Sequence, residues 1–175
     1  DRQELLAKHP QAKAWSANNA IFSASEIAAA RMRGKEDAFL VSGRLIEEKK
    51  PGLAVKALAE LDRSGARLIF IGDGQKLDEI REVARRLGVA DQVEFLGEVF
   101  DHEDLRAAYE RCIASISAGY VGLSMTQSHA FGLPMLYPDN EPHAPEVEAA
   151  EEGVNAVTFR SDDPTSLASA MREVI

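Results

Sequence analysis

The sequence has a single cysteine and no long apolar run. Cys112 stands alone, which excludes an intrachain disulfide framework and any zinc site built on two thiolates. We therefore expect a reducing, cytoplasmic environment. No apolar stretch approaches the roughly 20 residues that a membrane-spanning helix needs. The chain begins at Asp1 with neither an initiator methionine nor a signal peptide, so we expect a piece of a longer protein.

Basic residues are also scarce relative to acidic ones. The chain has 175 residues, with 20 Lys and Arg against 29 Asp and Glu, and a formal net charge of −9. This balance disfavours a protein that binds nucleic acid through broad phosphate neutralisation, which needs a basic surface. The length fits one domain that can bury a sizeable core without disulfides or metals.

Several catalytic signatures are missing. The histidines show no metal-ligand spacing, and no G-x-S-x-G elbow is present, so a Ser-His-Asp triad is not proposed. We expect neutral hydrogen bonding for His129 on a helix. His143 lies between Pro142 and Ala144 in a strand-to-helix loop, where a ligand contact or a structural role is open.

What the sequence does have, from residue 38 onward, is a regular alternation of apolar runs with segments of helical period. Strands are predicted at 39–42, 67–71, 93–96, 113–116, 134–137 and 156–159, and helices at 53–61, 77–87, 103–111, 124–131, 145–151 and from 164, after the N-cap residue Asp163. This pattern predicts an α/β domain over 37–175, with a doubly wound parallel sheet of about six strands. A barrel of eight such units would need about 250 residues. We interpret residues 1–36 as a connector or packing arm.

The loop Gly43–Pro51 is the first candidate site, because ligands of such sheets bind at the carboxyl ends of the strands. Arg44 follows the first strand directly, and Lys49 and Lys50 precede a helix. Their charges are expected to converge on an anion at that helix N-terminus. The alternative is a solvated charged loop.

Two glycine-containing turns follow later strands. Gly72-Asp73-Gly74 resembles a phosphate turn, but the third glycine of a dinucleotide fingerprint is replaced by Leu77, which disfavours an oxidoreductase and leaves a tight turn as the alternative. The segment 117–124 contains glycines that allow close backbone approach to a ligand, and a helix begins after it. No Lys-Ser/Thr pair follows, so it is not a nucleoside-triphosphate P-loop, and a plain turn is the alternative.

Taken together, these loops resemble the C-terminal, donor-binding domain of GT-B fold retaining glycosyltransferases of family 4, the glycosyl transferases group 1. The resemblance runs from about Phe39 to Arg172 and depends on the joint order of several motifs. These are G-R-x(4)-K at 43–49, I-G-D-G at 71–74, V-x-F-L-G at 93–97, G-L-x(8)-G-x-P at 122–134, P-E-V at 145–147 and a D-G-x-N-G-like piece at 152–155.

The resemblance implies a half of a GT-B fold that binds a UDP- or GDP-sugar and transfers a hexose to a glycan or lipid-linked acceptor held by an N-terminal domain absent from this chain. Arg44 and Lys49 would be the catalytic cations on the diphosphate. The implied substrate-binding residues are Gly43, Val99, Phe100, Gly119, Tyr120, Gly122, Leu123, Ser124 and Gln127. Neither a metal nor a resident cofactor is implied. The expected setting is cell-envelope or polysaccharide biosynthesis in the cytoplasm, with peripheral attachment of the full-length protein to the inner membrane as an option.

One departure concerns the paired glutamates of this family, which have seven residues between them. They fall on Gly119 and Gln127, and glycine has no side chain to contact a donor sugar. Either another group, such as Tyr120 or Glu141, takes over this contact, or the chain is a non-catalytic nucleotide-binding or interaction module.

Overall fold

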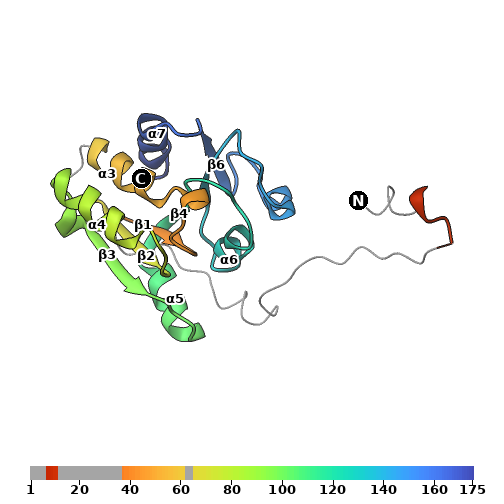
Figure 1. Ribbon diagram of the computed structural model, residues 1–175, viewed down its shortest axis with the longest axis horizontal. Coiled ribbons are helices and arrows are strands. Elements are labelled where there is room, and N and C mark those ends of the chain that lie inside the picture. Colours follow the sequence, from red (N-terminus) through yellow and green to blue (C-terminus); the bar gives the residue numbers. More distant parts are fainter. Residues whose placement is uncertain (1–6, 12–36, 62–64) are drawn as a thin grey trace.

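The structure is a computed structural model that describes residues 7–11, 37–61 and 65–175. It contains the six predicted strands and the helices between them (Figure 1). The strands are β1 (Ala38–Ser42), β2 (Arg67–Ile71), β3 (Val93–Gly97), β4 (Cys112–Ile116), β5 (Met135–Pro138) and β6 (Ala156–Phe159). The α-helices are α3 (Pro51–Glu60), α4 (Leu77–Arg86), α5 (His102–Glu110), α6 (Ser124–Ala130) and α7 (Pro164–Val174), with 3-10 helices η1 (Glu47–Lys49), η2 (Ala90–Gln92) and η3 (Pro145–Ala149). Apart from residues 7–11, the interpretation of 1–36 as a connector or packing arm falls outside the described residues.

All strand pairs are parallel, and the strand order is β3-β2-β1-β4-β5-β6. This is the doubly wound arrangement that the sequence predicts. The chain runs outward from β1 through β2 to β3, then returns to place β4 on the other side of β1. The direction of winding therefore changes between β1 and β4, and a crevice opens beyond the carboxyl ends of these two strands.

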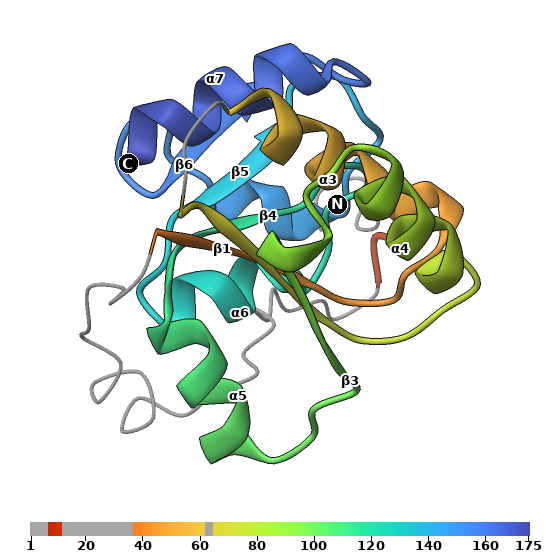
Figure 2. The same ribbon diagram turned by 90° about the vertical axis from the view of Figure 1, so that its left-hand side faces the viewer.

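The strand side chains alternate between two cores. Phe39 and Val41 belong to the core under α3, α4 and α7, whereas Ala38 and Leu40 belong to the core with α5 and the end of α6. Figure 2 shows these two helical layers on opposite sides of the sheet. Because both faces are covered, the central strands are mostly apolar, which explains why they read as apolar runs.

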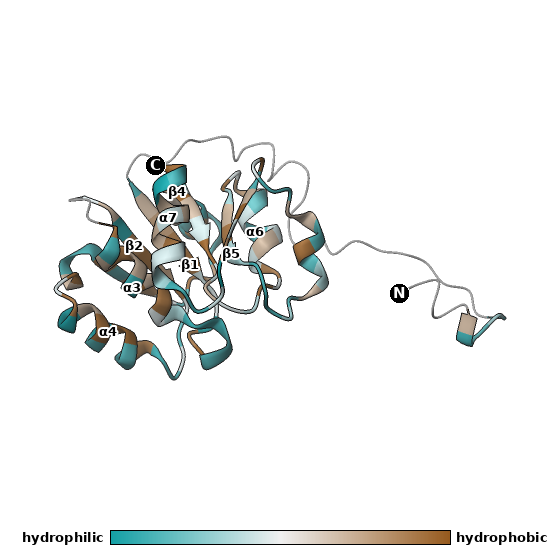
Figure 3. Cartoon of the chain, turned by 90° about the horizontal axis from the view of Figure 1, so that it is seen from above, coloured by the Kyte–Doolittle hydropathy of each residue, from teal (hydrophilic) through white to brown (hydrophobic). Residues whose placement is uncertain are grey.

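The outer helices are amphipathic. Ile80 and Val83 of α4 are buried, while its charged residues face outward, and Figure 3 shows the two classes on opposite sides of the helix. The predicted cap of α7 is confirmed, since the Asp163 carboxylate accepts a 3.0 Å hydrogen bond from the Ser166 amide. Asp101 caps α5 in the same way.

One predicted helix is shorter than expected. The segment 145–151 forms only the 3-10 helix η3, and the backbone is extended again at Ala150. Asn155 causes this ending, because its side-chain amide donates to the Ala149 carbonyl at 3.0 Å and its Oδ1 accepts from the Glu151 amide at 2.7 Å. Within residues 7–11, 37–61 and 65–175, no helix combines the length and apolar character that a bilayer crossing requires.

Candidate functional site

The loops beyond β1, β3, β4 and β5 enclose a cavity of about 730 Å³. This volume lies in the range of small-molecule binding sites. Its lining residues are Ser42, Gly43, Arg44, Lys49, Val99, Phe100, His102, Leu105, Tyr120, Gly122, Leu123, Ser124, Gln127, Ala144 and Glu146. Every residue predicted as catalytic or substrate-binding lies on this wall except Gly119, and Lys50, whose charge was expected to converge with that of Lys49, does not lie on it either. The structure therefore brings together residues that are up to 84 positions apart in the predicted set, from Gly43 to Gln127.

Two cations occupy one side of the cavity. Lys49 Nζ donates to the Tyr120 carbonyl at 2.7 Å and lies 4.7 Å from the centroid of the Tyr120 ring. Burial lowers the pKa of Lys49, and the neighbouring Arg44 charge lowers it further. Neither cation has a carboxylate partner among the described residues, so both charges remain available to an anion.

The loop that carries these cations, residues 43–50, is named the cation loop here. Hydrogen bonds hold it against the β2–α4 turn. The Gly43 amide donates to the Ile71 carbonyl and the Leu45 amide to the Asp73 carbonyl, both at 2.9 Å. Gly72 and Gly74 have positive φ, and a Cβ on either would clash with the backbone of the cation loop. The Gly72-Asp73-Gly74 segment is thus a tight turn that lets two loops approach closely.

Gly119 holds the same loop from the opposite side. A Cβ at Gly119 would clash with the Glu48 carbonyl, and the adjacent Tyr120 amide donates to that carbonyl at 3.0 Å. Gly119 is not among the residues that line the cavity, and its contact with a substrate stays a prediction. No side chain fits at this position, so a glutamate is excluded unless the cation loop moves.

Lys50 also differs from its prediction. Its side chain turns away from the cavity and pairs with Glu141 at 2.5 Å and Asp162 at 2.8 Å. The hydrogen bonds that its ammonium group donates to Asp162 and then to Glu141 raise the pKa of Lys50. Lys50 adopts the left-handed conformation, with φ 46° and ψ 43°, and this reverses its side chain relative to Lys49.

The two positions aligned with the paired glutamates have different surroundings. Gln127 lies on the cavity, where its Oε1 accepts a long hydrogen bond, 3.4 Å, from the Ser42 hydroxyl. Two residues were expected to substitute for the first glutamate. Tyr120 lines the cavity, whereas Glu141 forms an ion pair with Lys50 and is not part of the cavity lining. Glu146 instead supplies a carboxylate to the cavity wall.

Sequence reasoning missed several lining residues, namely Ser42, His102, Leu105, Ala144 and Glu146. The P-E-V motif, which follows a predicted strand, was the signal in the sequence that could have identified Glu146.

His143 has a structural role. Both of its ring nitrogens have partners: Nδ1 accepts from the Val121 amide at 3.1 Å, and Nε2 is 2.8 Å from the Pro138 carbonyl. It is therefore a structural link between two loops of the site.

A smaller cavity of about 220 Å³ adjoins the first beside the β3–α5 loop. Val99 and Phe100 line both cavities, and 87% of the Phe100 surface is exposed. An apolar, aromatic wall next to two cations suits a ligand that has a planar ring at one end and anionic groups at the other. Among the described residues, no group of three or more His, Cys, Asp or Glu side chains could hold a metal ion.

Two curated proteins share sequence with this chain. It is 35% identical over 92 residues, which are 49% of this chain and 24% of the relative, to the GalNAc-alpha-(1->4)-GalNAc-alpha-(1->3)-diNAcBac-PP-undecaprenol alpha-1,4-N-acetyl-D-galactosaminyltransferase of Campylobacter jejuni. It is 28% identical over 133 residues, 76% of this chain and 38% of the relative, to the lipopolysaccharide core biosynthesis glycosyltransferase LpsE of Rhizobium meliloti. The chain thus spans less than half the length of either relative.

A solved structure shares the fold. Anabaena HepE, whose crystal structure contains UDP-glucose, superimposes with a TM-score of 0.67 at 22% identity, over 87% of this chain and 43% of HepE. Residues 23–175 match the family described as glycosyl transferases group 1. This match covers most of the sequence and agrees with the doubly wound sheet and the order of its loops. The chain belongs to the glycosyl transferases group 1 family.

Proposed function

We propose that this chain is the nucleotide-sugar-binding part of a retaining, metal-independent hexosyltransferase. Its donor is a UDP- or GDP-sugar, and its acceptor is a glycan or a lipid-linked glycan, held by a further domain in a cytoplasmic enzyme. The observation that carries the proposal is the pair of cations, Arg44 and Lys49, on a cavity of about 730 Å³. Support for the donor and acceptor classes comes from UDP-glucose in HepE, and from the undecaprenol-linked glycan and the lipopolysaccharide core named for the two curated relatives.

Arg44 and Lys49 act on the diphosphate. Fixed cations in a partly desolvated cleft stabilise the negative charge that develops on a leaving nucleoside diphosphate. Gly122 and Leu123 line the same cavity, and their amides have no acceptor in the described part of the chain, so they add neutral donors. The base lies against Val99 and Phe100.

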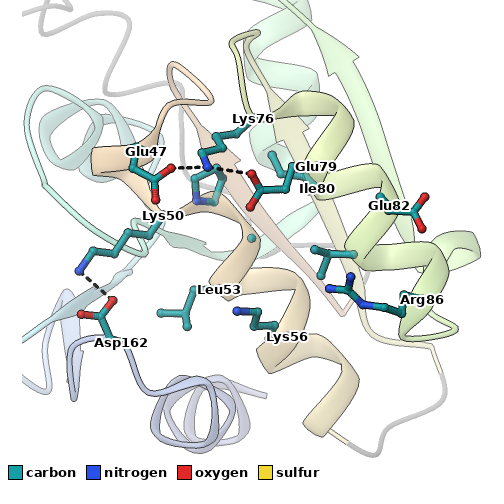
Figure 4. A pocket seen from close by; sticks show the side chains of 13 residues that line it. Glu47, Lys50, Leu53, Lys56, Lys76, Glu79, Ile80, Glu82, Arg86 and Asp162 are labelled. Carbon is teal, nitrogen blue, oxygen red and sulfur yellow. Dashed lines mark hydrogen bonds and ion pairs between the residues drawn. The ribbon is translucent and has the colours of Figure 1, made fainter.

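Titration calorimetry of this chain with UDP and with GDP tests the proposal, and heat with neither would contradict it. Arg44→Ala and Lys49→Ala each remove a charge-assisted contact of about 1.5–3 kcal/mol, so each weakens binding by about ten- to a hundredfold. Lys56→Ala is the matched control, because Lys56 is a cation outside this cavity, in the groove between α3 and α4 (Figure 4). Equal affinity in all three variants would remove the diphosphate assignment.

A non-catalytic nucleotide-binding module is the second candidate. Gly119 favours it, since the position has no room for the glutamate that the resemblance expects. Turnover separates the two functions. Release or transfer of the donor sugar by the full-length protein supports the transferase, whereas binding without turnover supports the module. Turnover that is unchanged by EDTA supports metal independence.

A further inference from the structure

The cation loop belongs to a closed ring of three loops. The first, residues 43–50, meets the second, 117–123, through the Tyr120 amide and the Glu48 carbonyl. The second meets the third, 138–146, through His143 and through the Ala144 amide, which donates to the Val121 carbonyl at 2.9 Å. Lys50 closes the ring, because its ammonium group lies 2.5 Å from the Glu141 carboxylate of the third loop.

A second ion pair of Lys50, with Asp162, carries a backbone cost at both ends. Within the described residues, the non-glycine residues with positive φ are Lys50, at 46°, and Asp162, at 59°. They are the two partners of one ion pair, 2.8 Å apart, as Figure 4 shows. L-residues adopt this conformation at the expense of steric strain, so two such residues persist only where the surrounding contacts hold them.

A second set of ion pairs holds the cation loop against α4. Glu47 pairs with Lys76, which also pairs with Glu79 of α4 at 2.7 Å (Figure 4). The ion pairs of Lys50 and Glu47 thus lie on the face of the loop opposite Arg44 and Lys49. Those two cations repel each other, and without opposing contacts the loop would relax by separating them.

We propose that Lys50 is a positioning residue, whose contacts with Glu141 and Asp162 hold the cation loop so that Arg44 and Lys49 face the same anion. Lys50 does not touch the cavity. Its side chain is only partly exposed, 27%, and that of Glu141 is 13% exposed, so the pair is screened less than a surface ion pair. The proposal rests on the proposed nucleotide binding for its effect on affinity, but not for its effect on the loops.

Two variants distinguish the effect of the Lys50 charge from the effect of its left-handed backbone. Lys50→Met removes the ammonium group and keeps the side-chain stem, whereas Lys50→Gly removes the contacts and also the left-handed strain. We expect both to bind UDP, or GDP if that is the ligand, about tenfold more weakly than the parent, a loss typical of residues coupled in one network. Lys50→Arg should stay within about twofold, since it keeps the charge.

A readout that needs no nucleotide is the hydrogen exchange of the Tyr120 amide, which reports the contact with Glu48. It should be about tenfold faster in Lys50→Met and Lys50→Gly, while the global unfolding free energy changes little. Arg85→Met is the control, because it removes an exposed cation paired with Glu82, away from the three loops.

The outcomes are distinct. If the parent chain binds neither UDP nor GDP, the proposed function fails, and Tyr120 exchange still decides the role of Lys50. Parental exchange and affinity in Lys50→Met would overturn the positioning role. Parental behaviour of Lys50→Gly, with loss in Lys50→Met alone, would also overturn it, because backbone strain rather than the ion pairs would then be responsible.

Discussion

Replacing Gly119 with alanine tests whether the cation loop needs close backbone contact at this position. The new Cβ would clash with the Glu48 carbonyl and lie 3.1 Å from the Lys49 carbonyl carbon. These are backbone atoms, so no side-chain rotation relieves the overlap. The loop must move away from the β4–α6 segment, and the hydrogen bond from the Tyr120 amide to Glu48 is lost or lengthened.

The magnitude follows from these two changes. Overpacking a tight contact costs about 1–3 kcal/mol, and a lost backbone hydrogen bond about 0.5–1.5 kcal/mol. Together they lower the free energy of unfolding by about 2–4 kcal/mol. At about 2–4 °C per kcal/mol for a domain of this size, the Tm of Gly119→Ala falls by about 4–16 °C.

Thermal unfolding followed by circular dichroism measures this change, with Gly122→Ala as the matched control. At Gly122 the nearest atom to a new Cβ is Cε1 of Tyr120, at 3.5 Å, which is an ordinary van der Waals distance. The unfolding free energy of this control should stay within about 0.5 kcal/mol of the parent value. Equal Tm values for the parent and for Gly119→Ala would refute the steric argument, and with it the exclusion of a glutamate at this position.

Two further predictions concern titration and capping. Because burial and Arg44 lower the pKa of Lys49, its charge is present below that lowered pKa and is lost as the pH rises through it, before an ordinary lysine would titrate. Calorimetric affinity for the nucleotide should therefore fall with rising pH in the parent before an ordinary lysine would titrate, and fall less in Lys49→Arg, and parallel curves would contradict this. Asp163→Ala removes the cap of α7 and should cost about 1 kcal/mol in urea unfolding, whereas Asp163→Asn keeps an acceptor and most of the stability. An equal loss in both Asp163 variants would show that the charge, through its contact with Arg160, matters more than the cap.

Much of the fold could be predicted because its signals are local. The apolar runs and helical periods fall within windows of a few residues, and six of them in alternation indicate a parallel sheet covered on both faces. The cap at Asp163 is equally local, since its partner is the Ser166 amide three residues later. The helix expected at 145–151 was too long, because the contact that ends it comes from Asn155, beyond that window.

The site was predictable where it depends on the ends of strands. Arg44 is the second residue after β1, and the segment 122–124 follows β4, so the sheet topology alone brings them to one crevice. Glu146 was passed over for Glu141, which is nearer in sequence to β5. Only the folded loop shows that Glu141 pairs with Lys50, while Glu146 reaches the cavity.

The sequence by itself determined the six strands, their alternation with helices, and the strand-end positions of Arg44 and Lys49, because these depend on short-range periodicity and on topology. The tertiary structure decided which way each lysine of the loop faces and what Gly119 does. Lys49 and Lys50 are adjacent, yet a positive φ at Lys50 sends their side chains to opposite sides of the loop. Gly119 is constrained by Glu48, 71 residues earlier, and no local window of the sequence contains that contact.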